Sequence, residues 1–389
     1  MEPNMQKKRT MTYDTAILHK AADKDPFTGA LSIPIYPAST YHQQNILARP
    51  DFEYSRAGNP TRKALEEVLA ALEKAQYAYA FASGMAAISG AIMACVKSGD
   101  HIIAARDIYG GTHRFLTGFL NRFNVTCSFA DTTDIKAVAK AVRPATKVLF
   151  LETPSNPLLK VTDVAACVAL AKKHSLITMI DNTFLSPYFF KPLDLGVDIS
   201  IHSATKFLGG HSDLIAGAVM CRSKALADTI CSVQISCGSI LSPENSWLLL
   251  RGIKTLSARM NVQQQSAQVI AEWLAQQPWV SDVFYPGLAG HPGHTIMKEQ
   301  AEGFGAVLSF RTDTVKRAHK LMKHVKLLAV AVSLGGVESI LSYPARMSHA
   351  SIPRKEREAL GITDTLLRFS VGLESPQDLI DDLGQAVNA

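Results

Sequence analysis

The chain has 389 residues, of which 47% are hydrophobic and 19% are charged, and its 40 lysines and arginines against 34 acidic residues give a formal net charge of +6. This composition is ordinary for a globular protein and excludes collagen-like, disordered and disulfide-scaffold classes. A single core rarely extends over so many residues, so we expect two packed units with connecting elements.

Charge, hydropathy and cysteine spacing narrow the possible partners. No run of five or more lysines and arginines occurs, so nothing indicates nucleic-acid binding. No stretch approaches the roughly 18 uninterrupted apolar residues of a membrane span, and the N-terminus lacks the apolar run of a secretory signal. The six cysteines form no Cys-x-x-Cys pair. We therefore expect a soluble cytoplasmic protein with reduced cysteines and no membrane contact.

The first 60 residues contain six of the 18 prolines. This density opposes regular helices and central strands, and it predicts an extended N-terminal arm over residues 1–60. A long arm cannot bury itself alone, so we expect it to lie on the main body or on a neighbouring subunit.

Short apolar runs alternate with helix-like stretches over residues 61–255, the expected larger domain. The runs that we interpret as strands are residues 77–82, 101–105, 125–130, 147–152, 176–181 and 199–204. Stretches long enough for a helix separate them, which is typical of parallel βαβ units in an α/β sheet.

Residues 244–277 are nearly free of glycine and proline and predict one long helix that joins two domains. Four further apolar runs follow, DVFYP, AVLSFR, LLAVAVS and LLRFSVG, with two or three helices among them. They predict a smaller α+β domain over residues 256–389.

Polar residues follow the predicted strands, and in open parallel sheets ligands bind beyond the carboxyl ends of the strands. The residues at these ends are Ser83, Gly84, Met85, Asp107, Tyr109, Asp131, Glu152, Asn156, Asp181, Asn182 and Ser203 to Lys206. The sequence therefore predicts a ligand site on this edge. It contains no Gly-x-Gly-x-x-Gly and no Walker-type motif, which disfavours a nicotinamide cofactor or a nucleoside triphosphate.

Lys206 and Asp181 are the most informative residues of this edge. Lys206 follows an apolar strand, where desolvation would lower the pKa of its amine and make it available for a Schiff base; a lysine that reaches to the surface is an equal alternative. The hydroxyls of Ser203 and Thr205 could hold a phosphate. Asp181 ends a very apolar run, so its carboxylate needs a cationic partner, either a protonated pyridine nitrogen or a structural arginine.

Other candidates are weaker when taken singly. Ser83, which Gly84 follows, can cap a helix, and the exposed N–H groups at the N-terminus of that helix would bind a phosphate. Most Ser-Gly pairs between a strand and a helix only cap the helix. Tyr54 and Arg56 lie together on the arm, where solvent exposure is the alternative to contact with a ligand. Arg368 lies in an apolar run and needs an anionic partner, for which a ligand carboxylate and a protein carboxylate are equal alternatives.

The histidines do not indicate a metal. His202, His211 and His349 lack metal-ligand spacing, and we interpret them as polar packing residues.

Together, the motifs resemble the pyridoxal phosphate (PLP)-dependent enzymes of cysteine and methionine metabolism, a family that includes cystathionine β- and γ-lyases, cystathionine γ-synthase and methionine γ-lyase. The motifs that carry the resemblance, in the family's order, are residues 54–62, 81–85, 109–112, 152–157, 181–183, 198–212, 333–339 and 368–374. The resemblance covers nearly the whole chain. It implies the fold type I, PLP transferase-like architecture with a mostly parallel sheet and a smaller C-terminal domain, assembled as a homotetramer of two tight dimers.

The resemblance also implies roles for the cofactor site. Lys206 would bind PLP covalently and act as general base, Asp181 would keep the pyridine nitrogen protonated, and Tyr109 would stack on the ring. The residues implied in phosphate binding are Gly84, Met85, Ser203 and Thr205, joined by Tyr54 and Arg56 from a neighbouring subunit. The implied catalytic residues are Lys206, Tyr109 and Tyr54.

For the substrate, a sulfur amino acid, the resemblance implies that Arg368 binds the carboxylate with Asn156 and Ser333 close by. Glu338 could face a distal ammonium group, with a surface or structural role as the alternative. Methionine γ-lyases typically have a cysteine where this chain has Gly111, and residues 342–350 are more similar to bacterial cystathionine β-lyases.

We therefore expect β-elimination of cystathionine to homocysteine, pyruvate and ammonia, a reaction of methionine biosynthesis. The alternatives are a γ-lyase or γ-synthase activity, and less so a methionine γ-lyase activity. A PLP-binding protein without turnover is the alternative from a different class.

Overall fold

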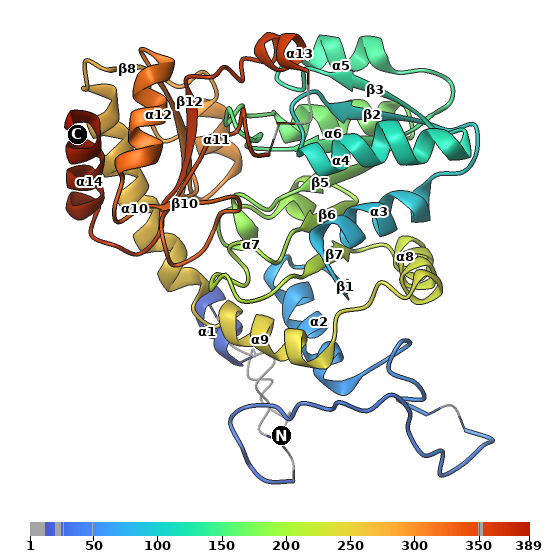
Figure 1. Ribbon diagram of the computed structural model, residues 1–389. Coiled ribbons are helices and arrows are strands. Elements are labelled where there is room, and N and C mark those ends of the chain that lie inside the picture. Colours follow the sequence, from blue (N-terminus) through green and yellow to red (C-terminus); the bar gives the residue numbers. More distant parts are fainter. Residues whose placement is uncertain (1–11, 20–24, 26, 49, 349, 351–352) are drawn as a thin grey trace, which may run out of the picture.

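The computed structural model describes residues 12–19, 25, 27–48, 50–348, 350 and 353–389 (Figure 1). They form a seven-stranded and a five-stranded sheet with helices packed against both. This is the predicted α/β architecture with a mostly parallel larger sheet and a smaller C-terminal sheet. Within the described residues, no helix is both long and apolar enough to cross a membrane.

The larger sheet has the strand order β1-β7-β6-β5-β4-β2-β3. Its strands are β1 (Tyr77–Phe81), β2 (His101–Ala105), β3 (Thr126–Ala130), β4 (Thr146–Glu152), β5 (Ile177–Asp181), β6 (Ile199–His202) and β7 (Gly217–Cys221). The first six confirm the predicted runs, and their mutual pairings are parallel. β7 was not predicted; it follows a loop rather than a helix, so it falls outside the alternation of strands and helices. It pairs antiparallel with β1 and β6.

Helices cover both faces of this sheet. On one face lie α2 (Pro60–Leu72), α5 (Ile135–Ala141), α6 (Val164–Lys173) and α9 (Pro243–Ile253). On the other face lie α3 (Gly84–Cys95), α4 (Gly110–Arg114) and α8 (Lys224–Cys237). The helix predicted after α3 is irregular, because α4 continues as a π-helical turn (Phe115–Phe119) and a 3₁₀ turn (Leu120–Phe123). Two short elements, α7 (Ser186–Phe189) and a 3₁₀ turn (Pro192–Leu195), connect β5 to β6.

The prediction of one helix over residues 244–277 is wrong, because α9 ends at Ile253 and α10 (Leu256–Ala275) begins a new helix. At the break, a Cβ atom on Gly252 would lie 2.2 Å from the carbonyl oxygen of Gly209. The Gly252 carbonyl accepts hydrogen bonds from Thr255 Oγ1 at 3.1 Å and from Arg259 Nη2 at 2.9 Å. At Gly252, hydrogen bonds from side chains thus replace the backbone hydrogen bonds of a continuous helix. Here the chain packs against the loop that follows Lys206.

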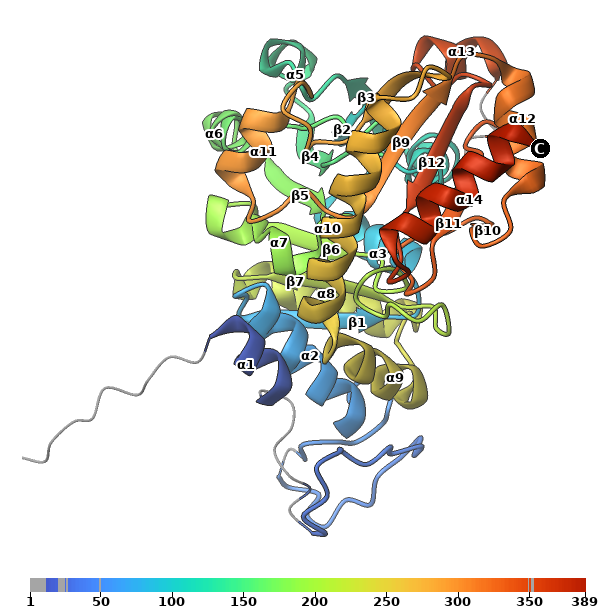
Figure 2. The same cartoon turned by 90° about the vertical axis from the view of Figure 1, so that its left-hand side faces the viewer.

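The smaller sheet has the order β10-β11-β12-β9-β8, and Figure 2 shows α10 running alongside it. Its strands are β8 (Val280–Phe284), β9 (Val307–Thr312), β10 (Ala329–Val330), β11 (Ile340–Ser342) and β12 (Leu366–Ser370). The helices of this part are α11 (His294–Gln300), α12 (Val315–His324), α13 (Arg354–Ala359) and α14 (Pro376–Asn388). β11 was not predicted. Among the described residues, α11, α12 and α13 lie between the predicted runs, in line with two or three helices, and α14 follows the last run.

The N-terminal arm is not extended throughout. Residues 13–19 form α1 (Tyr13–His19), whose Ile17 is buried in the core. This helix precedes the proline-dense stretch, so proline does not oppose it. The later arm is extended, with an isolated bridge between Thr40 and Tyr54, and it lies beyond α2 and α9 (Figure 1).

Candidate active site

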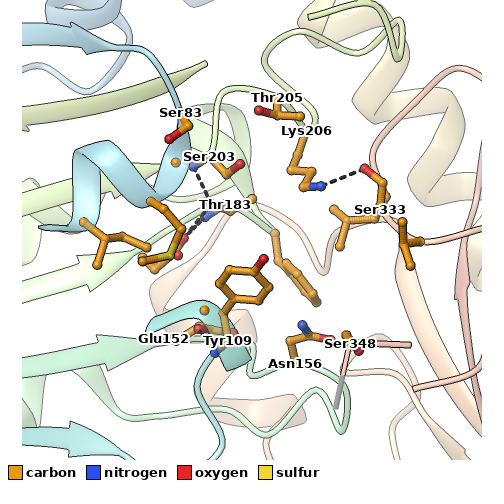
Figure 3. A pocket seen from close by; sticks show the side chains of 18 of the residues that line it. Ser83, Tyr109, Glu152, Asn156, Thr183, Ser203, Thr205, Lys206, Ser333 and Ser348 are labelled. Carbon is orange, nitrogen blue, oxygen red and sulfur yellow. Dashed lines mark hydrogen bonds between the residues drawn. The ribbon is translucent and has the colours of Figure 1, made fainter. Parts of the chain in front are cut away.

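A cavity of about 520 Å³ lies between the carboxyl ends of the larger sheet and the smaller sheet (Figure 3). This volume is in the range of ligand pockets, roughly 300–1,000 Å³. The predicted site residues that line it are Gly84, Met85, Tyr109, Asn156, Asp181, Ser203, Thr205, Lys206, Ser333 and Arg368. The structure therefore brings together residues that are spread over almost three hundred positions of the sequence.

Lys206 is directed into the cavity, and its Nζ atom donates a hydrogen bond to Ser333 Oγ at 2.7 Å (Figure 3). Burial lowers the pKa of this amine to about 8, with a further lowering by the charge of Arg368 and an opposing effect of Asp181. The alternative of a lysine that reaches to the surface is wrong. A partly neutral amine in a pocket can act as a nucleophile toward an aldehyde.

Asp181 ends β5 and is buried. Its Oδ1 atom accepts hydrogen bonds from Thr183 N at 3.0 Å and Thr183 Oγ1 at 2.5 Å. Burial raises the pKa of the carboxyl, and the bonds from Thr183 and the charges of His202 and Lys206 oppose this rise. Within the described part of the chain, Asp181 forms no ion pair with an arginine or lysine, so the structural arginine considered above is not found there.

Glu152 lies beside Asp181, because β4 and β5 pair these two residues in register. Burial, and then the charge of Asp181, raises the pKa of Glu152 well above its usual value. Its Oε2 atom accepts a hydrogen bond from the backbone N–H of Tyr109 at 2.8 Å. Glu152 therefore fixes the Tyr109 backbone, and burial beside a second carboxyl group favours its uncharged form.

Arg368 is buried on β12 and contacts only neutral partners among the described residues. Its Nη1 atom donates to Asn156 Oδ1 at 2.9 Å, and Nη2 donates to the Ser333 carbonyl at 2.7 Å and to Ser342 Oγ at 3.3 Å. The Nε atom is buried without a partner among these residues. Burial lowers the pKa of Arg368 to about 10, so it remains charged at neutral pH. A ligand carboxylate is then the remaining candidate for its anion.

The N-terminus of α3 forms an anion cradle at one end of the cavity. Ser83 caps this helix by accepting from Ala86 N at 3.0 Å, as predicted. A Cβ atom on Gly84 would lie 2.7 Å from Ser203 Cβ, so glycine permits the helix end to approach the loop after β6. The hydroxyls of Ser203 and Thr205 line the same end. Free N–H groups and the Ser203 hydroxyl fit a phosphate group, and the Thr205 hydroxyl beside them donates to the Ala216 carbonyl at 3.1 Å.

The residues therefore fit PLP, because the cavity offers a phosphate cradle, a desolvated lysine and a buried acid without a cation of its own. PLP carries a phosphate, an aldehyde and a basic ring nitrogen, one for each of these features.

Several predicted residues lie elsewhere. Tyr54 and Arg56 do not line the cavity of their own chain; the Arg56 guanidinium lies 5.6 Å from the centre of the Tyr54 ring and donates to Ile235 O at 3.0 Å. Glu338 is exposed and does not line the cavity either. His349 lies outside the described residues.

Three residues of the predicted polar edge are structural in this chain. Asp107 pairs with Lys160 at 3.4 Å, and Asp131 accepts from the backbone of Thr133 at 3.1 Å. Asn182 points away from the cavity and donates to a backbone carbonyl.

Sequence reasoning assigned no role to Thr183, Arg114 or Ser342, which also line the cavity. Thr183 had a signal, because a hydroxyl two residues after a carboxylate can hydrogen-bond to it. No signal in the sequence marks Arg114 or Ser342. The position of Arg114 depends on the turn after Tyr109, and that of Ser342 depends on the three-residue strand β11.

Comparisons with known proteins agree over nearly the whole chain. A family model described as Cys/Met metabolism PLP-dependent enzyme matches residues 14–388. The chain is 48% identical over 377 residues to a cystathionine γ-lyase of Bacillus subtilis (strain 168), covering 97% of this chain and 99% of the relative. It is also 48% identical over 380 residues to the cystathionine β-lyase MetC of the same strain, covering 98% and 97%. The crystal structure of a cystathionine γ-lyase from Lactobacillus plantarum complexed with L-serine superposes with a TM-score of 0.95 at 46% identity, covering 97% and 99%.

Proposed function

The chain belongs to the Cys/Met metabolism PLP-dependent enzyme family, and on that premise we propose that it cleaves cystathionine by β-elimination and releases homocysteine, pyruvate and ammonia. It is a lyase of this family, and PLP is its cofactor. The observation that carries the proposal is that one cavity holds the Lys206 amine, the Asp181 carboxylate and the Arg368 guanidinium.

Each of these groups has a distinct task in the proposed reaction. PLP, when bound, withdraws electrons from the Cα atom of an amino acid. Lys206 would hold the cofactor and, once displaced by the substrate amine, would accept the Cα proton at Nζ; its pKa of about 8 suits a base at neutral to mildly alkaline pH. Asp181 would face the pyridine nitrogen, and the Tyr109 ring would lie against the cofactor. The residues that would hold the phosphate are Gly84, Met85, Ser203 and Thr205.

Two cations are placed for a substrate with an amino-acid group at each end. Arg368 lies at the base of the cavity and would bind the carboxylate next to the reacting carbon. Arg114 also lines the cavity but is exposed, and no described carboxylate pairs with it. We propose that Arg114 binds the distal carboxylate. The exposed Glu338 would meet the distal ammonium only if the substrate extends beyond the lining residues.

Gly111 supports the choice against a methionine γ-lyase activity. A Cβ atom at this position would lie 2.4 Å from Tyr109 Cε1 and 2.9 Å from Met85 Sδ. A cysteine here would therefore displace the Tyr109 ring, so the position of that ring depends on glycine.

We further propose that Tyr54 and Arg56 act in the site of a neighbouring subunit within a homotetramer. Both are exposed on the arm and do not line the cavity of their own chain. Our proposed division of the chain remains an arm over residues 1–60, a cofactor domain over residues 61–255 and a C-terminal domain over residues 256–389.

Product analysis on cystathionine tests the reaction. We expect pyruvate and homocysteine from the purified holoenzyme. Formation of 2-oxobutyrate and cysteine would overturn β-elimination in favour of γ-elimination. The observation that favours this second candidate is the 48% identity to a cystathionine γ-lyase. A protein that binds PLP without releasing either product set would be the non-catalytic alternative.

A further inference from the structure

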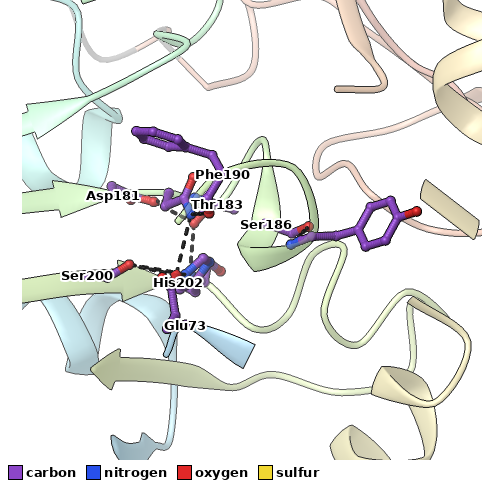
Figure 4. Close-up of polar contacts among 10 residues, drawn as sticks. Glu73, Asp181, Thr183, Ser186, Phe190, Ser200 and His202 are labelled. Carbon is purple, nitrogen blue, oxygen red and sulfur yellow. Dashed lines mark hydrogen bonds and ion pairs between the residues drawn. The ribbon is translucent and has the colours of Figure 1, made fainter. Parts of the chain in front are cut away.

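The hydrogen bond between Lys206 Nζ and Ser333 Oγ joins the two parts of the molecule, because Lys206 follows β6 of the larger sheet and Ser333 precedes β11 of the smaller one. Asp181, by contrast, is held within the larger sheet by Thr183, two residues later in the chain (Figure 4). The bond between Lys206 and Ser333 therefore depends on how the two parts are placed against each other. At 2.7 Å it leaves little tolerance for a shift of either part.

The beginning of α10 holds the loop that carries Lys206. Arg259 lies in the first turn of this helix and is 3% exposed. Its Nη1 atom donates to the carbonyl of Phe207, the residue after Lys206, at 2.8 Å. Its Nη2 atom donates to the Gly252 carbonyl at 2.9 Å, and its Nε atom donates to Thr255 Oγ1 at 3.0 Å. Because the guanidinium group is a rigid planar fork, it fixes the two carbonyls relative to each other.

The loop is shaped to receive this guanidinium group. Gly210 has a φ of 74°, and a Cβ atom on it would lie 2.2 Å from Arg259 Nη1. Burial lowers the pKa of Arg259 to about 10, so the side chain is charged at neutral pH. Among the residues that the structure describes, it pairs with no carboxylate. A buried cation without a counter-ion is unfavourable for stability, which points to a role in placing the loop.

One turn later on α10, Gln263 holds the segments that carry Ser333 and Arg368. Gln263 is fully buried, and its Nε2 atom donates to the Gly336 carbonyl at 2.7 Å and to the Val371 carbonyl at 3.0 Å. Gly336 lies three residues after Ser333, and Val371 lies three residues after Arg368. Residues four positions apart lie on the same face of a helix. One face of α10 therefore binds the backbone on both sides of the cavity.

The two loops held by α10 also contact each other. Gly335 has a φ of 78°, and a Cβ atom on it would lie 2.7 Å from the backbone nitrogen of Phe207. Phe207 thus has Gly335 at its nitrogen and Arg259 at its carbonyl. The relative position of Lys206 and Ser333 is thereby fixed at the backbone.

We propose that Arg259 and Gln263 are positioning residues: Arg259 holds the Lys206 loop and Gln263 holds the Ser333 loop, so that α10 sets the distance between the Lys206 amine and the Ser333 hydroxyl before PLP binds. Neither Arg259 nor Gln263 lines the cavity. This inference rests on the proposed function, because Lys206 is the group that would hold PLP and accept the proton.

The experiment compares the variant Gln263→Met with the variant Gln264→Met. Gln263→Met keeps the length of the side chain but removes the donor to the two carbonyls. Gln264, the next residue of α10, accepts hydrogen bonds from the backbone N–H groups of Phe304 at 2.6 Å and Gly305 at 3.2 Å. These two loop residues do not line the cavity. Gln264→Met is therefore the matched control, because it releases a loop that is not part of the site.

Three measurements separate the two variants. In the full chain freed of PLP, hydrogen exchange of residues 333–337 should rise about fivefold in Gln263→Met, the effect of one lost hydrogen bond. The pH midpoint of Lys206 acetylation should move up by about one unit, because water reaches the amine and Arg368 moves away from it. In the holoenzyme, kcat/KM for cystathionine should fall by about 10- to 100-fold, since a shift of about 1 Å has effects of this size.

Gln264→Met should lower the melting temperature to a similar extent but leave all three quantities within about twofold of the wild type. Equal hydrogen exchange and equal acetylation midpoints in the two variants overturn the inference.

Arg259→Lys tests the fork, because lysine keeps the charge but cannot bind both carbonyls. We expect hydrogen exchange of residues 203–210 to be faster than in the wild type and slower than in Arg259→Met. A lysine variant that behaves as the wild type would overturn the role of Arg259.

The wild-type protein decides the question if the variants do not fold. Because α10 and not the cofactor holds the two loops, residues 203–210 and 333–337 should be protected from hydrogen exchange after removal of PLP as well as in the holoenzyme. Loops that are protected only in the holoenzyme overturn the inference without any variant. The proposed function fails separately, through the product analysis described above.

Discussion

The amine of Lys206 donates a hydrogen bond to the hydroxyl of Ser333 at 2.7 Å, although the two residues are 127 positions apart. Ser333 has a φ of 88°, which is rare for a residue other than glycine and costs of order 1–3 kcal/mol. The same residue offers its carbonyl to Arg368 Nη2 at 2.7 Å. One strained residue of the smaller part thus orients both the proposed base and the proposed carboxylate-binding group.

Replacing Lys206 with alanine should remove both the attachment point of PLP and the base. We expect turnover to fall by at least about 10³-fold, because proton transfer alone contributes roughly 10²–10⁴-fold. Intact mass after borohydride reduction should show retained cofactor in the wild type and none in Lys206→Ala. Lys224→Ala, at an exposed position of α8, is the matched control and should retain it. Retained cofactor mass in Lys206→Ala would assign the attachment to another residue.

The acidity of Lys206 can be measured in protein freed of PLP. Because its pKa is lowered to about 8, its amine should lose the proton well below the pH at which an ordinary lysine, with a pKa of about 10.4, does so. Trace acetylation followed by peptide mass spectrometry should give a labelling rate that rises with pH and reaches half its maximum near pH 8. In Arg368→Leu the midpoint should move to higher pH, since the arginine charge favours the neutral amine. A midpoint above pH 10 in the wild type would contradict the burial of this amine.

Arg368→Leu should affect the substrate rather than the cofactor. Truncating one partner of a buried charge pair costs about 2–5 kcal/mol, which is roughly 30- to 4,000-fold in kcat/KM. Arg368→Lys keeps the charge but not the two-pronged geometry and should fall between the wild type and the leucine variant. PLP affinity should change little in either. An unchanged kcat/KM for Arg368→Leu would mean that the substrate carboxylate binds elsewhere.

Thr183→Val tests the hydrogen bonds that support Asp181. The substitution removes Oγ1, a donor to the carboxylate, with little change of shape, so the pKa of Asp181 should rise and PLP affinity should fall. A lost hydrogen bond to a charged group is worth about 1.5–3 kcal/mol, or roughly 10- to 150-fold in affinity. Thr183→Ser retains the hydroxyl and should bind PLP as the wild type does. Equal affinities of the valine and serine variants would remove Thr183 from this role.

Local patterns in the sequence were enough to predict the strands and the residues at their carboxyl ends, because a strand buried on both faces is a continuous apolar run. Asp181 and Lys206 could be singled out on that basis. The buried hydrogen bond between Glu73 and His202 could not be predicted, because the two residues are 129 positions apart. The break before α10 was also hidden, since it results from the contact of Gly252 with a loop of the larger sheet. Tertiary contacts of this kind leave no periodic signal in the chain.

The arm allows a decisive test of whether Tyr54 and Arg56 act on a neighbouring subunit. The buried Arg62 holds their segment in place by donating to the carbonyls of Ser55 at 2.8 Å and Arg56 at 3.3 Å. The segment is therefore ordered although its side chains lie outside the cavity of its own chain.

We expect Arg56→Ala to weaken PLP binding through the phosphate and Lys206→Ala to be inactive. When the two variants are unfolded and refolded together, a mixed dimer combines the intact Lys206 of one chain with the intact Arg56 of the other, and random pairing restores about a quarter of the sites. Activity should then exceed the sum of the separately refolded variants, with Lys206→Ala refolded with wild-type protein as the control for exchange. If both residues acted within one chain, every site of a mixed dimer would lack either Lys206 or Arg56. Activity would then not exceed the sum of the separately refolded variants. Arg62→Leu should resemble Arg56→Ala in PLP affinity, because it releases the same segment without touching the phosphate itself.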